Sequence, residues 1–306
     1  MVALGYTLTG CAAKQPTTAA EYESVAEEHL RLGSYTQAAE SYRSLLDEHP
    51  FSEHSEQAEL KVGVAQYMDG TCPEASATLT DFQRRHPTSG YLPLVGYLLG
   101  QCAEKQMQPS DRDQSASQNA HAYYQALIQQ HPSSPYAALA RQRLAHARET
   151  LATHELDVAD YYERQNNVRA AEIRLLDLVN RFPDTEVAGK ALYQLGQLYE
   201  GPGATEKAQL AYAAVGYHYP EHLEARDAER RLEGLTAAGP LPSGDPLVLL
   251  RSETGRTRTI AIAQAPRASG ESARRSGPGP GGGGLGLPSG AGPFGRSQNP
   301  YGQGRY

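Results

Sequence analysis

The sequence predicts an all-α protein: a solenoid of about five helical hairpins, followed by a disordered tail rich in Gly, Pro and Arg. Three observations support this fold class. Pro follows an aromatic residue or His at five places, which divide residues 19–236 into similar units. Between these places, small and bulky apolar residues recur at helical spacing. After residue 238 chain-breaking residues dominate, with 16 of the 30 Gly and 9 of the 20 Pro. The five pairs are His49-Pro50, His86-Pro87, His131-Pro132, Phe182-Pro183 and Tyr219-Pro220.

The repeated unit matches the tetratricopeptide pattern, a helical hairpin of about 34 residues that ends in Pro. Small residues in the middle of each helix let the two helices approach closely, and bulky residues fill the space on either side. Because a single hairpin cannot bury its apolar face, the hairpins are expected to stack continuously over residues 19–236. The unit ending at Pro220 places Leu192, Leu195, Gly196, Tyr199, Ala208, Tyr212 and Val215 in the pattern, and the unit ending at Pro50 places Tyr22, Val25, Ala26, His29, Ala38, Tyr42 and Leu45.

The boundaries of the helices follow from the residues around each Pro. The Pro ends the second helix of a unit, and Ser52, Ser89, Ser134 and Asp184 or Thr185 are expected to cap the helix that follows. Two units depart from the pattern. The third carries an insertion around 106–117, which predicts a polar loop. In the fourth, residues 134–166 contain no interior Gly or Pro after Pro135, which predicts an unusually long first helix.

The N-terminal residues 1–10 are apolar and uncharged, and they lead into Leu8-Thr9-Gly10-Cys11. This tetrapeptide resembles the bacterial lipobox, whose Cys is acylated, with palmitate among its fatty chains, and becomes the first residue of the mature protein. We therefore expect residues 1–18 to be the remnant of a lipoprotein signal peptide and a tether, with lipid on Cys11. No Lys or Arg precedes the apolar run, so the true start is expected upstream of Met1. The alternative is an incidental Cys in a frayed terminus.

Charge and composition exclude several classes of function. The chain carries a net charge of −7, and its last 68 residues are basic, with eight Arg against Asp245, Glu253 and Glu271, so the body is acidic. An acidic body argues against nucleic-acid binding. The sequence contains no run of about 18 apolar residues, so it predicts no membrane-spanning helix. Residues 237–306 are expected to be low-complexity and largely disordered, with two β-prone runs, 246–250 and 257–263, that suggest a marginal hairpin.

The sequence does not predict an enzyme, and it predicts neither a metal site nor a cofactor. The zinc motif HExxH is absent, and Pro220 separates His218 from His222. The stretch 201–207, GPGATEK, lacks the second Gly and the Ser or Thr of a phosphate-binding loop, and it is better explained as a turn before Thr205 caps a helix. The three His-Pro histidines occupy repeat positions. A hydrolase with a repeat domain remains open only if the tail carries its site.

Four stretches together bear a likeness to a known family. They are Pro50-Phe51-Ser52, the Asp111–Gln114 insertion, the pattern Leu151-Ala152-x-His154-Glu155-Leu156-x-Val158-Ala159-x-Tyr161-Tyr162, and Phe182-Pro183-Asp184-Thr185. With the lipobox, the chain resembles the BamD family, the outer-membrane lipoproteins of the β-barrel assembly machinery, over roughly residues 8–236. The resemblance implies a lipid-anchored scaffold on the periplasmic face of the outer membrane. Its implied partners are a barrel-forming subunit with periplasmic domains and unfolded outer-membrane proteins. The alternative is a periplasmic repeat scaffold for cell-envelope division or wall synthesis.

Two surfaces are candidates for binding. Positions that line the inner face of the second and third repeats include Leu60, Val64, Tyr67 and Tyr97, an apolar groove suited to an extended peptide. The resemblance implies that the N-terminal repeats bind unfolded substrates. It also places an interface Arg nine residues before the Pro that ends the fourth repeat, which is Arg174. The alternatives are that the two Tyr fill space between hairpins and that Arg174 pairs locally with Asp177.

Cys72 and Cys102 are expected to form a disulfide. Cys72 lies at the start of the second helix of one hairpin, and Cys102 lies near the end of the next, antiparallel helix. Both therefore reach the same edge of the stack, and an exported protein meets an oxidising compartment. The alternative is two independent small apolar side chains.

Overall fold

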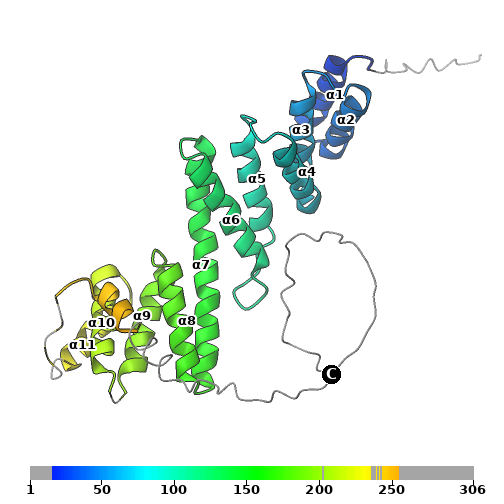
Figure 1. The fold of residues 1–306 in the computed structure, drawn as a ribbon. Coiled ribbons are helices and arrows are strands. Elements are labelled where there is room, and N and C mark those ends of the chain that lie inside the picture. Colours follow the sequence, from blue (N-terminus) through cyan, green and yellow to red (C-terminus); the bar gives the residue numbers. More distant parts are fainter. Residues whose placement is uncertain (1–15, 202, 236–238, 240, 242, 255–306) are drawn as a thin grey trace, which may run out of the picture. The chain divides into compact units, whose positions relative to one another are not determined.

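A computed structural model describes residues 16–201, 203–235, 239, 241 and 243–254, and all regular structure in these ranges is helical (Figure 1). The prediction of an all-α fold is confirmed. The helices are α1 (Ala19–Arg31), α2 (Tyr35–Glu48), α3 (Ser55–Met68), α4 (Cys72–Arg85), α5 (Leu92–Glu104), α6 (Ser115–Gln130), α7 (Pro135–Arg164), α8 (Val168–Arg181), α9 (Glu186–Tyr199), α10 (Thr205–His218) and α11 (Ala225–Leu235). Residues 246–254 form a further helical segment.

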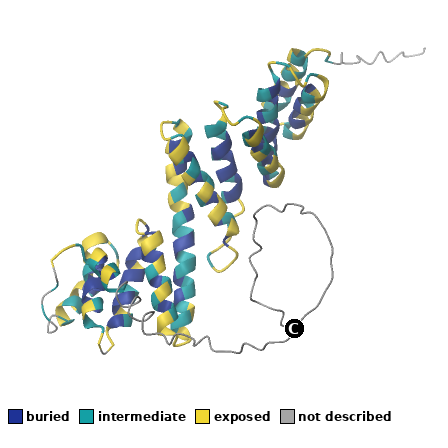
Figure 2. Cartoon of the chain, viewed as in Figure 1, coloured by how far each residue is buried: buried dark blue, intermediate teal, exposed yellow. Residues whose placement is uncertain are grey.

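The helices pack as a continuous stack of antiparallel hairpins. Each helix from α1 to α11 contacts the next one along the chain, as Figure 1 shows. In addition, α3 contacts α5, α5 contacts α7, and α7 contacts α9. Contacts between alternate helices join successive hairpins, so the tetratricopeptide-like solenoid expected from the repeats is confirmed. Buried residues lie where neighbouring helices meet, and the exposed residues lie on loops and outer faces (Figure 2).

Glycine makes the close approach of paired helices possible at three crossings. A Cβ atom on Gly63 would lie 2.7 Å from the side chain of Leu79, which is closer than real Cβ contacts. The rings of Tyr124 and Tyr212 occupy the same space beside Gly100 and Gly196. Gly196 and Tyr212 are both positions of the repeat pattern, Gly196 as a small residue that allows close approach and Tyr212 as a bulky residue that fills the space.

Tyrosine fills the centre of three hairpins. Tyr42, Tyr124 and Tyr212 are fully buried, and each comes from the second helix of its unit. Two of the hydroxyl groups reach carboxylates at the hairpin edge: Tyr124 Oη donates to Glu104 at 2.6 Å, and Tyr212 Oη donates to Glu200 at 2.6 Å. Tyr124 and Tyr212 thus each combine an apolar ring in the core with a paired polar end.

The two departures from the repeat pattern appear as predicted. A loop over residues 105–114 joins α5 to α6, and α7 runs for 30 residues. The insertion loop is tied to α7, because His154 Nδ1 lies 2.6 Å from the carbonyl oxygen of Ser110. The amide of Gln114, which is buried, closes the loop by donating to the carbonyl of Pro109 at 2.8 Å.

The predicted caps are partly correct. Ser134 is the N-cap of α7 and accepts from the Tyr136 N–H at 3.2 Å, and Thr185 is the N-cap position of α9. The assignment of Ser52 and Ser89 was wrong, because one turn of chain precedes the helix at each place. In both turns the Ser N–H donates to the carbonyl of the His three residues earlier, so α3 and α5 begin later. α10 begins at Thr205 itself, with Ala204 as its N-cap position.

The prediction of a β-strand over 246–250 is wrong, because this segment is helical. Leu247 and Leu250 are buried in the core cluster of the last hairpins, and their spacing of three residues matches one face of a helix. Asp245 accepts from the N–H of Leu247 at 2.8 Å and of Val248 at 3.4 Å, which caps the segment. Burial of Leu side chains therefore overrides strand propensity. The second run, 257–263, lies outside the described residues.

Candidate partner-binding surfaces

The predicted groove contains a short ladder of side-chain hydrogen bonds. Tyr67 Oη donates to Gln101 Oε1 at 2.9 Å, and Gln101 Nε2 donates to Tyr97 Oη at 3.2 Å. The ammonium group of Lys105 lies 3.9 Å from the centre of the Tyr67 ring, a cation–π contact. This surface, which we call the Tyr67–Tyr97 ladder, presents aromatic rings, an amide and one cation. Its Lys was not recognised from the sequence, since it lies just beyond the end of α5.

Leu60 and Val64, which were predicted to line the groove, are less exposed than that prediction implies. Leu60 is only 3% exposed and packs in the cluster that contains Phe82 and Leu99. Its side chain therefore belongs to the core beneath the groove rather than to the exposed surface expected from the sequence. Val64 is half-buried against the same cluster. Tyr97 also packs against Tyr136 of α7, with ring centres 5.8 Å apart, so it fills space between hairpins as well as lining the ladder.

Arg174 lies on α8 in a network of ion pairs with α7. Its Nη1 is 3.1 Å from Glu155 Oε2, and Arg181 Nη1 is 3.0 Å from Glu155 Oε1. Asp177 pairs with Arg181 at 3.3 Å. The alternative explanation, a local pair between Arg174 and Asp177, is therefore wrong, because the side chain of Arg174 turns across to α7. Glu155 is 12% exposed and the side chain of Arg174 is 43% exposed, so the carboxylate orients a guanidinium that solvent still reaches.

The two predicted disulfide partners lie together. Cys72, the first residue of α4, and Cys102 of α5 form a small buried cluster with Ala75. Both are free thiols in this structure. Burial, together with a hydrogen bond to Cys72, raises the pKa of the Cys102 thiol to about 12. The structure thus brings the two sulfur atoms to one place, and the bond between them stays a prediction.

Other expectations fall on residues without a described structure. Cys11 and the tail from residue 255 onward lie outside the described ranges. Within those ranges, no helix combines the length and apolarity that crossing a bilayer requires. The described residues also include no group of three or more His, Cys, Asp or Glu side chains arranged to hold a metal ion.

Comparison with known proteins places the chain in a family. Residues 14–214 match the YfiO family, described as "Outer membrane lipoprotein". The "Outer membrane protein assembly factor BamD" of Caulobacter vibrioides is 29% identical over 254 residues, covering 79% of this chain and 83% of that protein. The protein of the same name from Vibrio cholerae is 31% identical over 193 residues, 60% of this chain and 80% of that protein. The one from Neisseria meningitidis serogroup A is 28% identical over 240 residues, 72% and 90% of the two chains. The chain with the helical stack, the Tyr67–Tyr97 ladder and the Arg174 network therefore belongs to the YfiO family of outer membrane lipoproteins.

Proposed function

We propose that this protein is a non-enzymatic assembly factor for outer-membrane β-barrel proteins, held at the periplasmic face of the outer membrane by lipid on Cys11. The observation that carries the proposal is the extent of the likeness to the Caulobacter assembly factor, which spans 83% of that protein. The fold agrees with this role, because a continuous stack of hairpins presents extended surfaces for binding other proteins.

The anchor and the stack are close in sequence. Cys11 precedes the first residue of α1, Ala19, by eight residues. A single fatty chain binds a membrane only marginally, whereas the several chains of a bacterial lipoprotein hold it stably. In this arrangement the first hairpin lies within a short tether of the membrane surface. The helices themselves need no membrane-spanning segment.

The barrel-forming subunit is proposed to bind at Arg174. A guanidinium group binds a carboxylate through two parallel hydrogen bonds, and such pairs are among the stronger polar contacts at interfaces. One nitrogen of Arg174 is engaged by Glu155 among the described residues. That contact holds the fork in place, and its remaining donors are available for an acidic group of the partner.

The Tyr67–Tyr97 ladder is proposed to bind unfolded barrel substrates. An extended terminal strand that ends in an aromatic residue offers a ring and a carboxylate. The rings of Tyr67 and Tyr97 suit the former, and the ammonium group of Lys105 suits the latter. The hydrogen bonds through Gln101 keep the two rings in register.

Co-purification from membranes tests this function. The full-length chain, with its complete signal sequence and an affinity tag, is isolated in mild detergent, and the bound proteins are identified by mass spectrometry. We expect a barrel-forming membrane protein with periplasmic domains. Recovery of wall-synthesis or division proteins in its place would support the alternative scaffold. A Cys11→Ala variant serves as the control for the anchor, since it should move to the soluble periplasmic fraction.

A further inference from the structure

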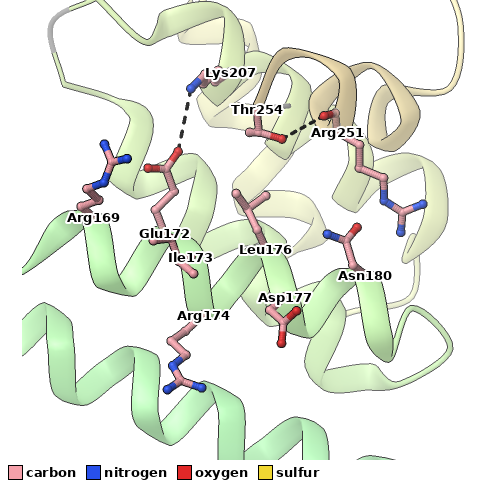
Figure 3. A pocket seen from close by; sticks show the side chains of 10 residues that line it. All are labelled: Arg169, Glu172, Ile173, Arg174, Leu176, Asp177, Asn180, Lys207, Arg251 and Thr254. Carbon is pink, nitrogen blue, oxygen red and sulfur yellow. Dashed lines mark hydrogen bonds and ion pairs between the residues drawn. The ribbon is translucent and has the colours of Figure 1, made fainter. Parts of the chain in front are cut away.

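A pocket lies on α8 beside the Arg174 network. Its volume is about 470 Å³, and α8 forms its floor (Figure 3). Lys207 of α10 contributes one wall, and Arg251 and Thr254 of the helical segment 246–254 contribute another. Figure 3 shows Arg174 pointing away from the pocket, toward the neighbouring helix that carries Glu155. Arg174 therefore borders the pocket, but its guanidinium group makes its ion pair outside it.

The helical segment 246–254 is held firmly at this place. Leu250 is fully buried and Leu247 is 6% exposed. Asp245, which caps the segment, lies 2.8 Å from His218 Nε2 at the end of α10. Arg251 Nη2 donates to the carbonyl oxygen of Val179 on α8 at 3.3 Å. These contacts fix the wall of the pocket, although the segment follows the region of the family match, which ends at residue 214.

The charges in the pocket are unbalanced. Apart from Arg174, which pairs with Glu155 outside it, three cationic side chains line the pocket, and its two carboxylates are already engaged. Glu172 accepts from Tyr199 Oη at 2.7 Å and lies 3.8 Å from Lys207, and Asp177 pairs with Arg181 outside the pocket. An excess of positive charge therefore remains in the pocket.

Two of the cations keep unused hydrogen-bonding capacity. Arg251 Nε is buried and has no hydrogen-bond partner within the described chain, which is costly for a polar group. Arg169 is exposed and makes no hydrogen bond or ion pair with any described residue. Figure 3 shows Arg169 at one end of the pocket and Arg251, with the amide of Asn180, at the other. The apolar side chains Ile173 and Leu176 lie between them.

We propose that this pocket binds an acidic peptide segment of a protein partner, with carboxylates at Arg251 and Arg169 and an apolar side chain over Ile173 and Leu176. The volume exceeds that of a single small anion, and the apolar floor favours a side chain over a hydrated ion. Carboxylates complement the two guanidinium groups. The inference rests on the proposed function in that the barrel-forming subunit is the expected source of the segment. The segment 246–254 then acts as part of a binding site.

Peptide binding tests the pocket directly. The full chain is titrated into a fluorescein-labelled peptide with a Glu-Leu-Glu core, and anisotropy is compared with that of the Gln-Leu-Gln peptide. We expect the acidic peptide to bind at least ten-fold more tightly. Arg251→Gln and Arg169→Gln should each weaken its binding about ten-fold. Equal binding of the two peptides, or no binding of the acidic one up to about 1 mM, overturns the proposal.

Two variants separate binding from folding. Arg169 is exposed and touches no described partner, so Arg169→Gln leaves the helical stack intact. Arg84→Gln on the distant α4 is the matched control, since Arg84 is similarly exposed and should not alter peptide binding. Wild-type affinity of the Arg251→Gln and Arg169→Gln double variant for the acidic peptide would refute the pocket and leave the proposed function standing. Failure of the wild type to recover any barrel-forming protein would refute the proposed function, and the peptide titration would still decide the pocket.

Discussion

The ring of Tyr212 lies against Gly196, in the space that a β-carbon at that position would occupy. Tyr212 comes from α10 and is fully buried, and Gly196 comes from the middle of α9. The hydroxyl of Tyr212 is fixed at the far end by Glu200, 2.6 Å away. The ring is therefore held from both sides and cannot yield to an added methyl group.

Gly196→Ala should destabilise the protein by about 1–3 kcal/mol, the range for overpacking a tight core. The cost arises because the two helices must separate or the ring must leave its position. Thermal or urea unfolding measures it. Gly216→Ala is the matched control: Gly216 lies in the same hairpin, is exposed, and has open space around it. That substitution should stabilise by up to about 1 kcal/mol through helix propensity. Equal effects of the two substitutions would argue against the packing explanation.

Arg174→Gln should weaken binding of the barrel-forming subunit at least ten-fold, equivalent to about 1.4 kcal/mol. It should change thermal stability little, because Arg181 still pairs with Glu155 at 3.0 Å. Binding is measured by titration with the purified periplasmic domains of the partner. Arg181→Gln removes the other half of the same network and serves as the control. If the Arg174→Gln and Arg181→Gln variants bound the periplasmic domains of the partner with equal affinity, Arg174 would have only a structural role.

The repeat pattern was sufficient to predict the fold because it fixes which residues meet. Gly196 and Tyr212, or Gly63 and Leu79, occupy defined positions in the hairpin, and the structure places each pair in contact. The pattern says less about surface side chains. Glu155 is 19 residues before Arg174, and only the long α7 brings the two together.

Two further differences come from tertiary burial. Leu60 was expected to line the groove, but it is buried in the core cluster that also contains Phe82. The run 246–250 has strand-forming residues, and its helical form depends on a core that other helices provide for Leu247 and Leu250. Neither outcome follows from local sequence, since both depend on what lies opposite. The excess positive charge of the pocket on α8 could not be predicted from the sequence for the same reason.

Cys72 and Cys102 should be joined in protein exported by its native signal. Oxidation removes two protons and two electrons, which an exported thiol–disulfide oxidoreductase accepts. The intact mass under non-reducing conditions, and alkylation after denaturation, report the bond. Closing the loop should stabilise by roughly 3–4 kcal/mol in the chain-entropy model, and a reductant should remove this gain. Cys72→Ala is the control and should be insensitive to reductant. Two alkylated thiols in the exported wild type would exclude the disulfide.

Acid should loosen the helical segment 246–254 through Asp245. The hydrogen bond from His218 Nε2, 2.8 Å away, holds the pKa of Asp245 below its usual value, and the backbone N–H groups of Leu247 and Val248 add to the effect. Because the pKa is depressed in the folded state, the stabilisation is present above the unfolded value of about 3.9 and is lost as pH falls through the folded pKa. Below about pH 4 the segment should therefore detach first.

Hydrogen-exchange protection of the amides of 247–250 measures this detachment, with amides in α9 as the internal reference. Protection in the wild type should stay level from neutral pH down to about pH 4.5 and then fall. Asp245→Asn is the sharpest comparison, because Asn caps a helix about as well as Asp but carries no charge. The variant should show lower protection at neutral pH and no acid step of its own. A wild-type acid step that persists unchanged in Asp245→Asn would mean that another carboxylate controls the segment. In that case the contact between His218 and Asp245 would be incidental to its attachment.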